Sequence, residues 1–419
     1  MIQASNELIL GIELNEEYAQ LTYFHPSVKE PLTLSFEPDA EQYLLPMAMR
    51  KDAGGKWELW DGTGETAATQ VTDLYRKLQT EDEIETGAEQ ISAAELLAEY
   101  FAACIGRLKV LTANAQLQVM VTVRTLTERW SNLIVQALER NGLDRKRIYL
   151  QDYLSSFYYY TVNQKKELWN HDVALIEYVD EAIVGYILHI DRTTRPAIAR
   201  ATEVARQPVG ADIRGEMEEA DWNKERDRLF FELLKKLFER RTVTVSYLVG
   251  DYFGKSWAER SIQYLCFKRH AYQGQNLYSK GACYAAMERA GLIAERGILF
   301  GGRDMIQVNL QMEMRIRGKE QMYPLISAGM NWYEAHHVCE FILDDEREIR
   351  ITSQPMAEGD PIVHMMRLPG LPHRPPRATR VRMTVYFSAP GCCHIEVEDL
   401  GFGEFYRSTG MVWKREIKF

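Results

Sequence analysis

Three carboxylates in this sequence have the residue types and the surroundings for metal-assisted chemistry. Glu13 and Glu177 each lie within an apolar segment, and Asp152 directly follows another one. Oxygen atoms are the ligands that Mg²⁺ prefers, so the three side chains would form a magnesium site if the fold brought them together. Carboxylates without a phosphate group beside them hold Mg²⁺ only weakly. We therefore favour the interpretation that these residues line a polar cleft without a resident metal.

A second set of residues has the ligand types for zinc, but its spacing matches no standard zinc site. Its members are histidines and cysteines of the C-terminal part: His336, His337, Cys339, Cys392, Cys393 and His394. Adjacent residues of a strand point to opposite faces, which separates Cys392 from Cys393. We therefore expect no metal site here.

Composition and charge exclude several classes of function. The net charge of the chain is −10, whereas a protein that coats nucleic acid needs a basic face to replace counterions. The arginine-rich run Arg374–Arg382 is interpreted as a solvated edge, with an anionic partner site as the alternative. No apolar run reaches the roughly 18 residues of a membrane-spanning helix. We expect neither a nucleic-acid nor a membrane partner.

The first residues and the cysteines bear on the cellular compartment. Residues 1–25 lack the basic and apolar pattern of a signal peptide. The six cysteines are scattered and form no CxxC pair, which is typical of small core residues in a reducing compartment. We therefore expect a cytoplasmic protein.

Two segments of similar pattern must position the carboxylates. Leu8–Phe24 reads as an apolar strand, an acidic turn and a returning strand, and Val173–Ile190 repeats that order. Each hairpin is followed by a further buried strand, at Leu117–Val123 and at Val243–Val249. The repeat predicts two like-folded halves, residues 1–165 and 166–304, with a cleft between them.

Helix signals lie between and after these strands. Ser92–Glu95 and Ser256–Glu259 both match the capping-box pattern, in which each side chain binds a free backbone N–H group. Asn276–Met287 places small residues along one helix, which lets it approach a sheet or a ligand closely. From Met305 onward alternating strand patterns replace helices. We predict an all-β sandwich over residues 305–419.

Four short motifs resemble those of the actin-like ATPase superfamily, and the seventy-kilodalton heat-shock chaperones are the most similar members. Gly11–Asn15 (GIELN) resembles the first phosphate loop, which usually reads G-I-D-L-G-T-T. Gln151–Leu154 stands where the chaperones carry N-E-P-T, and Leu248–Asp251 resembles the strand and turn of the adenosine motif. Lys280–Ala282 resembles the K/I-G-A-A signature of the following helix.

The tail extends the resemblance to nearly the whole chain. Leu368–Pro372, His394–Asp399 and Ser408–Gly410 resemble successive motifs of the β-sandwich that grips peptides in the chaperones. The resemblance implies an α/β fold, namely a duplicated actin-like (ribonuclease H-like) ATPase fold followed by an all-β sandwich. It also implies nucleotide-binding and partner-binding residues. The first group is Gly11, Glu13, Asn15, Asp152, Glu177, Gly250, Asp251 and Gly281, and the second is Phe341, Ile349 and Ile351.

The departures from the family pattern decide the functional expectation. Backbone N–H groups grip phosphates where loops are rich in glycine and small hydroxyls, but the first loop reads Asn15–Glu17 and the second Glu177–Glu181. Residues 210–250 hold about one helix instead of a helical subdomain. We expect a non-catalytic chaperone-like or scaffold protein with a protein partner and no cofactor. The alternatives are a divergent ATP-binding protein or ATPase with ATP and Mg²⁺, and a sugar-kinase-like enzyme.

Overall fold

The computed structural model is mixed α/β and consists of two compact units. It describes residues 7–28, 30–35, 43–63, 69–87, 89–108, 116–179, 181–254, 256–344, 347–356 and 359–419. Unit 1 is Met1–Gly302 and unit 2 is Arg303–Phe419. Among the helices of the described residues, none is long and apolar enough to cross a membrane.

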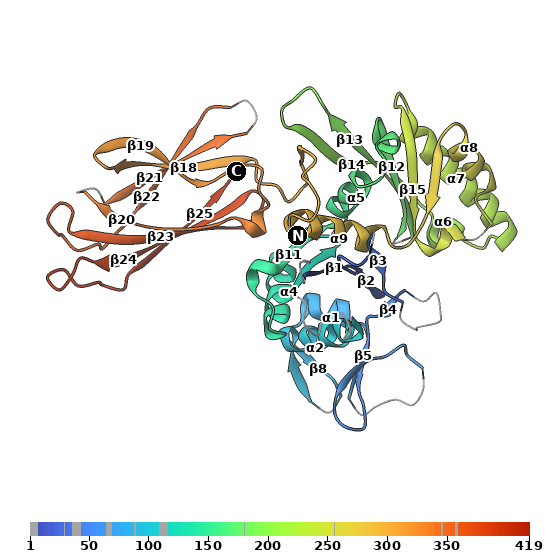
Figure 1. Cartoon of the computed structure of the whole chain (residues 1–419), viewed down its shortest axis with the longest axis horizontal. Helices are drawn as coiled ribbons and strands as arrows, with labels where there is room; N and C mark the ends of the chain where they lie inside the picture. Colours follow the sequence, from blue (N-terminus) through green and yellow to red (C-terminus); the bar gives the residue numbers. More distant parts are fainter. Residues whose placement is uncertain are drawn as a thin grey trace. The chain divides into compact units, whose positions relative to one another are not determined.

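The first sheet of unit 1 has the strand order β11-β10-β1-β2-β3, with β4 paired to β2 (Figure 1). Its strands are β1 (Glu7–Leu14), β2 (Tyr18–Phe24), β3 (Leu32–Thr33), β4 (Leu45–Pro46), β10 (Gln116–Val123) and β11 (Ile148–Asp152). The pair β1–β2 is antiparallel, and β10 and β11 run parallel to β1. The predicted hairpin Leu8–Phe24 is confirmed.

The second sheet has the order β16-β15-β12-β13-β14-β17. Its strands are β12 (Asp172–Val179), β13 (Ala182–Asp191), β14 (Ala197–Pro208), β15 (Val243–Val249), β16 (His270–Gln273) and β17 (Ile298–Phe300). Here β12–β13 is the antiparallel hairpin, and β15 and β16 run parallel to β12. The hairpin predicted at Val173–Ile190 is therefore confirmed, and it lies in a different sheet from the first hairpin. The five strands β11-β10-β1-β2-β3 and the five strands β16-β15-β12-β13-β14 therefore share one order and one set of directions.

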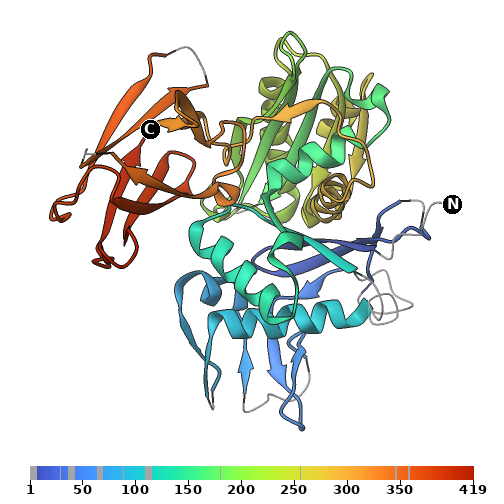
Figure 2. The same cartoon turned by 60° about the vertical axis from the view of Figure 1, so that its left-hand side comes forward.

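The α-helices of unit 1 are α1 (Leu74–Thr80), α2 (Ala93–Ile105), α4 (Glu128–Arg140), α5 (Tyr153–Val162), α6 (Ala211–Arg214), α7 (Glu219–Phe238), α8 (Glu259–Cys266) and α9 (Leu277–Arg289). Shorter strands are β5 (Met49–Lys51), β6 (Trp57–Leu59), β7 (Gln70–Val71), β8 (Glu83–Glu85) and β9 (Gln90–Ser92). The described residues of unit 1 also form the 3₁₀-helices η1 (Gly106–Leu108), η2 (Arg145–Arg147), η3 (Lys166–Trp169) and η4 (Asp251–Gly254). Helix α2 packs against α4 (Figure 2).

The two predicted capping boxes have different outcomes. Ser92 caps α2, because its hydroxyl accepts a hydrogen bond from the backbone N–H of Glu95 at 3.3 Å. The box predicted at Ser256–Glu259 is wrong, since α8 begins only at Glu259 and its N-cap residue is Ala258. A four-residue pattern alone does not fix where a helix begins.

The core of the second half lies on both faces of its sheet. Successive side chains of a strand point to opposite faces. Val173 and Leu175 of β12 accordingly pack in a cluster with α5, whereas Ala174 and Ile176 pack in a cluster with α7 and α8. Burial on both faces explains why β12 reads as an almost continuous apolar run.

Unit 2 is built from two four-stranded sheets, orange to red in Figure 1. Their orders are β19-β18-β21-β22 and β20-β23-β24-β25. The strands are β18 (Val308–Ile316), β19 (Lys319–Ile326), β20 (His336–Leu343), β21 (Glu348–Pro355), β22 (Ile362–Arg367), β23 (Thr379–Ala389), β24 (Cys392–Gly401) and β25 (Val412–Lys418), with one 3₁₀-helix, η5 (Trp332–Glu334). All strand pairs within these sheets are antiparallel.

Candidate functional site: a polar cleft in unit 1

A cavity of about 630 Å³ lies in unit 1 between the turns of the two hairpins. Its lining combines the β1–β2 turn with residues of β12, β15 and the start of α7. Acidic groups come from several of these elements, and aromatic rings come from others. The lining residues used below are Glu13, Asn15, Glu16, Glu17, Arg124, Tyr153, Glu177, Tyr178, Gly210, Trp222, Arg226, Gly250, Tyr252 and Tyr278.

Two tyrosines occupy the floor of the cleft, and each one holds a buried carboxyl group. The hydroxyl of Tyr153 lies 3.2 Å from Glu13 Oε1 and 3.1 Å from the carbonyl oxygen of Leu14. The hydroxyl of Tyr278 donates to Glu177 Oε1. The two rings are stacked, with their centroids 4.1 Å apart and their planes 18° from parallel. Aromatic pairs of this kind add about 1 kcal/mol beyond the area that they bury.

The two carboxyl groups bound by these tyrosines, Glu13 and Glu177, differ in their electrostatic surroundings. Arg124 Nη1 lies 3.3 Å from Glu177 Oε2, and the guanidinium group also covers the ring of Tyr153. Burial raises the pKa of Glu13 to about 8, although the hydrogen bond from Tyr153 and the charge of Arg124 act in the opposite direction. At neutral pH Glu13 is therefore mostly protonated, whereas Glu177 has a cationic partner.

The turn between β1 and β2 satisfies its own backbone. The side-chain oxygen of Asn15 accepts hydrogen bonds from the backbone N–H groups of Glu17 and Tyr18, at 2.9 and 2.8 Å. The N–H of Asn15 donates in turn to the carbonyl oxygen of Tyr18 at 3.0 Å. An Asn side chain that bonds the backbone two residues on is a usual turn device. These N–H groups already have partners, so a ligand would have to displace Asn15 to reach them.

The corresponding turn of the second half contains Glu181, whose φ of 57° is left-handed. The carbonyl oxygen of Glu181 accepts a hydrogen bond from the N–H of Val209 at 2.7 Å. Its side chain packs on Gly210, where an added Cβ would lie 2.4 Å from Glu181 Oε2. Asp180 lies outside the described residues. The described part of this turn therefore presents the carboxylate of Glu181 to the cleft.

Arg226 of α7 organises an aromatic group on another side of the cleft. Its guanidinium carbon lies 4.2 Å from the ring centroid of Trp257, and it is within 6 Å of the rings of Tyr178 and Trp222. Tyr178 stacks on Tyr252 with centroids 4.4 Å apart. Arg226 Nη2 donates to the side chain of Asn223 at 2.6 Å. The buried Nε has no hydrogen-bond partner among the residues that the structure describes. A cation held among rings in this way is favourable by about 1 kcal/mol or more.

Four of the predicted nucleotide-binding residues line the cleft: Glu13, Asn15, Glu177 and Gly250. Asp152 does not line it, since it is buried as the N-cap of α5 and its Oδ1 accepts hydrogen bonds from the N–H and hydroxyl of Ser155. The side chain of Asp251 lies outside what the structure describes. Among the described residues, Glu13, Asp152 and Glu177 do not form a group with ligand atoms within 4.8 Å of one another. The magnesium arrangement considered from the sequence is therefore not assembled.

The two remaining residues, Gly11 and Gly281, serve the packing of α9. A Cβ on Gly11 would lie 2.3 Å from the carbonyl oxygen of Ser279, and one on Gly281 would lie 2.0 Å from that of Ser156. Real Cβ atoms do not approach backbone so closely. These glycines therefore let α9 contact β1 and α5, and neither lines the cleft.

The residues predicted to bind a partner lie in unit 2. Ile349 and Ile351 of β21 are 3% and 0% exposed, so they belong to the core and cannot touch a partner directly. Successive side chains of a strand point to opposite faces, so Ile349 and Ile351 face the core whereas Arg350 between them is exposed. Phe341 of β20 is half-buried and is the one predicted contact residue with exposed surface.

Sequence reasoning did not select the two tyrosines and the two arginines that organise the cleft. Tyr153 lies within the motif Gln151–Leu154, and Tyr278 stands two residues before the motif Lys280–Ala282. Arg124 directly follows the predicted strand Leu117–Val123. Position after a buried strand was thus the available signal for Arg124. We find no comparable signal for Arg226.

Comparison with known protein families covers both units. Residues 30–302 match the model described as "Family of unknown function (DUF5716) C-terminal", and the chain belongs to this family. Residues 305–419 match the model described as "Domain of unknown function (DUF8552)". A search of curated proteins found no match.

Proposed function

We propose that this protein is a non-catalytic chaperone-like or scaffold protein, in which a degenerate actin-like domain accompanies a partner-binding β-sandwich. The repeated strand order of the two sheets in unit 1 supports the duplicated, ribonuclease H-like part of this proposal. Each hairpin would then correspond to one phosphate loop of the superfamily. The position of the cleft between the two hairpin turns agrees with that assignment.

The observation that carries the proposal is the state of the first hairpin turn. Its N–H groups at Glu17 and Tyr18 bond the side chain of Asn15, whereas a phosphate loop keeps such groups free for its ligand. Losing these two hydrogen bonds would cost about 1 kcal/mol each. A phosphate in this position would also meet the adjoining side chains of Glu16 and Glu17, whose negative charges repel it.

Electrostatics oppose a phosphate for a second reason. Glu177 lines the cleft and is paired to Arg124, so this cation is already engaged. Two like charges about 4 Å apart repel by about 1 kcal/mol in water and about 4 kcal/mol near a protein surface. Several phosphate oxygens beside these carboxylates would therefore make ATP binding unfavourable without a metal to neutralise them.

One alternative is a divergent ATP-binding protein or ATPase with Mg²⁺. A cavity of about 630 Å³ with aromatic walls has the size of an ordinary small-molecule site, and this observation favours the alternative. Arg124 would then have to leave Glu177 and bind phosphate. Substitution of Arg124 therefore distinguishes the ATP-binding alternative, which needs this side chain for phosphate, from the non-catalytic proposal.

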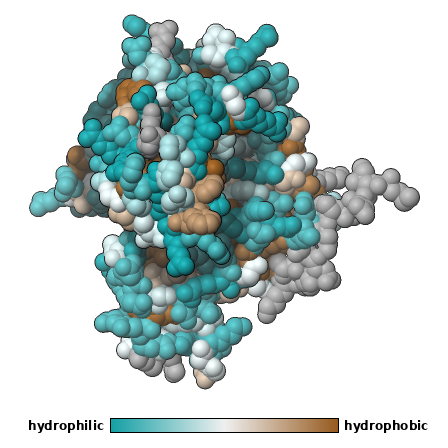
Figure 3. Space-filling view, turned by 90° about the vertical axis from the view of Figure 1, so that its left-hand side faces the viewer, coloured by the Kyte–Doolittle hydropathy of each residue, from teal (hydrophilic) through white to brown (hydrophobic). Residues whose placement is uncertain are grey.

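Unit 2 is proposed to bind one specific protein partner rather than generic apolar peptides. The segment that would arch over a peptide is the β18–β19 turn, which consists only of Arg317 and Gly318, both with positive φ. Arg315 and Glu320 flank it with an ion pair of 2.8 Å. The molecular face in Figure 3 is mainly hydrophilic, with scattered hydrophobic residues. Burying unpaired charges against an apolar peptide would cost several kcal/mol.

Steady-state phosphate release from ATP with Mg²⁺ tests the non-catalytic assignment. We expect no turnover above the buffer rate for the wild type and for Glu177→Gln, which keeps the shape of the cleft floor. The ATPase alternative would be established if the wild type hydrolysed ATP, if Glu177→Gln and Arg124→Ala each abolished this turnover, and if Arg192→Ala left it unchanged. Arg192 is a suitable control because it lies outside the cleft lining.

A further inference from the structure

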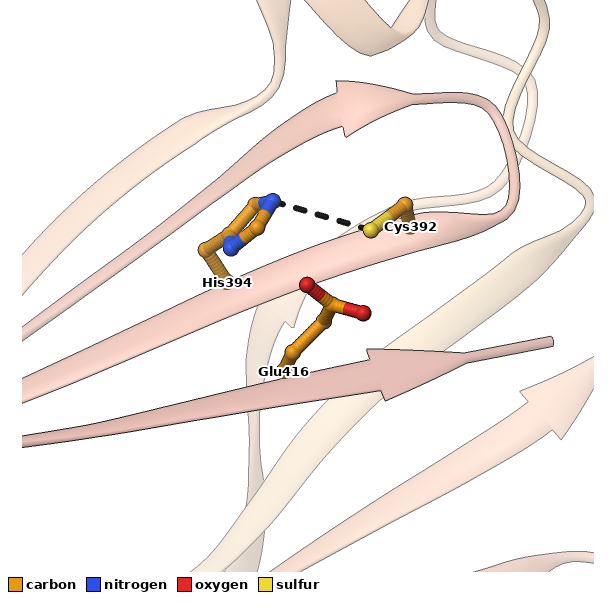
Figure 4. Close-up of side chains that lie close together, drawn as sticks. All are labelled: Cys392, His394 and Glu416. Carbon is orange, nitrogen blue, oxygen red and sulfur yellow. Dashed lines mark hydrogen bonds between the residues drawn. The ribbon is translucent and has the colours of Figure 1, made fainter.

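Three potential metal ligands meet on neighbouring strands of unit 2. Cys392 and His394 are two residues apart on β24, so their side chains share one face of the sheet. Glu416 on β25 is the direct cross-strand partner of His394. Ligand atoms of the three side chains all lie within 4.8 Å of one another. Figure 4 shows the three groups gathered over the same strands.

The separation of the sulfur and the nitrogen has the value that zinc requires. With usual bond lengths, a tetrahedral zinc ion places a sulfur and a nitrogen ligand about 3.6 Å apart. The distance between Cys392 Sγ and His394 Nε2 is 3.6 Å. Because Cys392 and His394 lie on one face of the same regular strand and Glu416 lies on the strand paired to it, little reorganisation of the backbone would be needed.

The ligand types point to zinc among the common divalent ions. Mg²⁺ and Ca²⁺ take oxygen ligands almost exclusively, and a thiolate with an imidazole does not suit them. Thiolate, imidazole and carboxylate are together the usual ligands of Zn²⁺. We propose that Cys392, His394 and Glu416 bind one Zn²⁺ ion and leave its fourth position to water or to a ligand from outside.

The present neighbours of these side chains are compatible with metal entry. Ser388 Oγ lies 2.6 Å from His394 Nε2, and Lys418 forms an ion pair of 3.0 Å with Glu416. The side chain of Lys418 is 77% exposed, so its pair with Glu416 contributes little and is readily exchanged. Cys392 and His394 are half-buried and Glu416 is exposed, so solvent and ions reach the group.

This inference reverses the expectation drawn from the sequence. Adjacent residues do point to opposite faces, and Cys393 is accordingly buried in the core. The residue two positions away, His394, remains on the face of Cys392, and Glu416 joins them only through strand pairing. Zinc would thereby tie β25 at the edge of the sheet to β24.

Titration of the whole chain with ZnCl₂ tests the proposal, after chelator treatment and in a phosphine reductant that does not compete for metal. We expect one Zn²⁺ per chain in calorimetry and a higher Tm of unit 2 on addition of zinc. Cys392→Ser and His394→Asn should each weaken binding by at least about 100-fold, because a lost ligand should cost at least as much as a lost outer-shell partner. Glu416→Gln should weaken it by at least about 10-fold, since the amide keeps an oxygen atom but loses the negative charge. No binding by the wild type would overturn the proposal.

Two matched controls locate the ion. Cys266→Ser removes an exposed cysteine of unit 1, and Glu396→Gln removes the next carboxylate on the same face of β24. Both should leave the affinity unchanged. Binding that survives Cys392→Ser but is lost in Cys339→Ser would place zinc elsewhere and contradict the assignment. Co²⁺ added to the wild type should give a thiolate charge-transfer band, and absence of this band would also contradict it, independently of how the variants fold.

Discussion

The ring of Tyr153 is stacked on the ring of Tyr278, with the centroids 4.1 Å apart. Tyr153 begins α5 and holds Glu13 of β1, whereas Tyr278 lies at the start of α9 and holds Glu177 of β12. One stacked pair therefore connects the central strands of both sheets in unit 1. The pair fills the floor of the cleft and gives the two buried carboxyl groups their hydrogen-bond donors.

Substitution of Tyr153 should separate the contribution of its ring from that of its hydroxyl. Tyr153→Phe keeps the stack but leaves Glu13 without its donor, which should lower the free energy of unfolding by about 1–3 kcal/mol. Tyr153→Ala should lower it by about 3–5 kcal/mol because a large cavity remains. Urea unfolding of both variants measures the difference. Equal losses in the two variants would show that the stacked ring contributes nothing.

Glu13 should make the stability of unit 1 depend on pH. Burial raises its pKa from the ordinary 4.5 to about 8 in the folded protein, so the folded state binds the proton more tightly than the unfolded chain. The stabilisation is fully present below about pH 4.5 and is lost as the pH rises through about 8. Between these values, the wild type should lose up to about 1.4 kcal/mol per pH unit relative to Glu13→Gln. Urea unfolding of both proteins at several pH values measures this difference. Parallel pH profiles would contradict the assignment.

Gly281 should show a reversed response to alanine. In an exposed helix, Gly→Ala stabilises by about 1 kcal/mol, but here the new Cβ would lie 2.0 Å from the carbonyl oxygen of Ser156. We expect Gly281→Ala to destabilise the protein by about 1–3 kcal/mol through overpacking. Thermal unfolding checks the sign. Gly274→Ala is the control, because its Cβ would meet only Asn276 Oδ1 at 3.8 Å. A stabilising Gly281→Ala would refute the close α5–α9 contact.

Arg374 forms a buried pair with Asp399 in unit 2, with two parallel contacts of 2.7 and 2.8 Å. The side chains are 4% and 0% exposed. Burial would raise the pKa of Asp399, but hydrogen bonds from Arg374 and from Thr409 outweigh it and hold the pKa below its usual range. Arg374→Met should cost about 3–5 kcal/mol by leaving a buried charge alone. Adding Asp399→Asn should restore part of that loss in urea unfolding, because the amide carries no charge and its oxygen can still accept from Gly401 or Thr409. Two additive losses would contradict the coupling.

The sequence predicted elements well where apolar residues alone define them. Strand β12 is buried on both faces and was visible as a continuous apolar run, as was β1. Strands β19 and β25 are hard to predict, because β19 includes Pro324 and exposed charged residues and four of the seven residues of β25 are charged. Such strands are stabilised by pairing with their neighbours rather than by their own hydrophobicity.

The sequence predicted the two glutamates of the cleft but not the tyrosines that bind them. Glu13 and Glu177 were identified because they stand in the two segments compared with phosphate loops, Gly11–Asn15 and Glu177–Glu181. The tyrosines that satisfy them lie on helices and stand 140 and 101 residues later in the chain. Only the fold brings these donors to the carboxyl groups. Arg374 illustrates the same limit, since its arginine-rich run suggested a solvated edge and the structure instead pairs it with a distant aspartate.

Calorimetric titration of the purified chain with ATP and Mg²⁺ tests the central claim most directly. The engaged N–H groups of the Asn15 turn and the carboxylates beside them predict no measurable binding at millimolar ATP. Glu13→Gln and Arg124→Ala should give the same flat titration as the wild type. Saturable heat with a micromolar Kd that Arg124→Ala abolishes, while Arg192→Ala preserves it, would contradict the account and identify the cleft as a working nucleotide site.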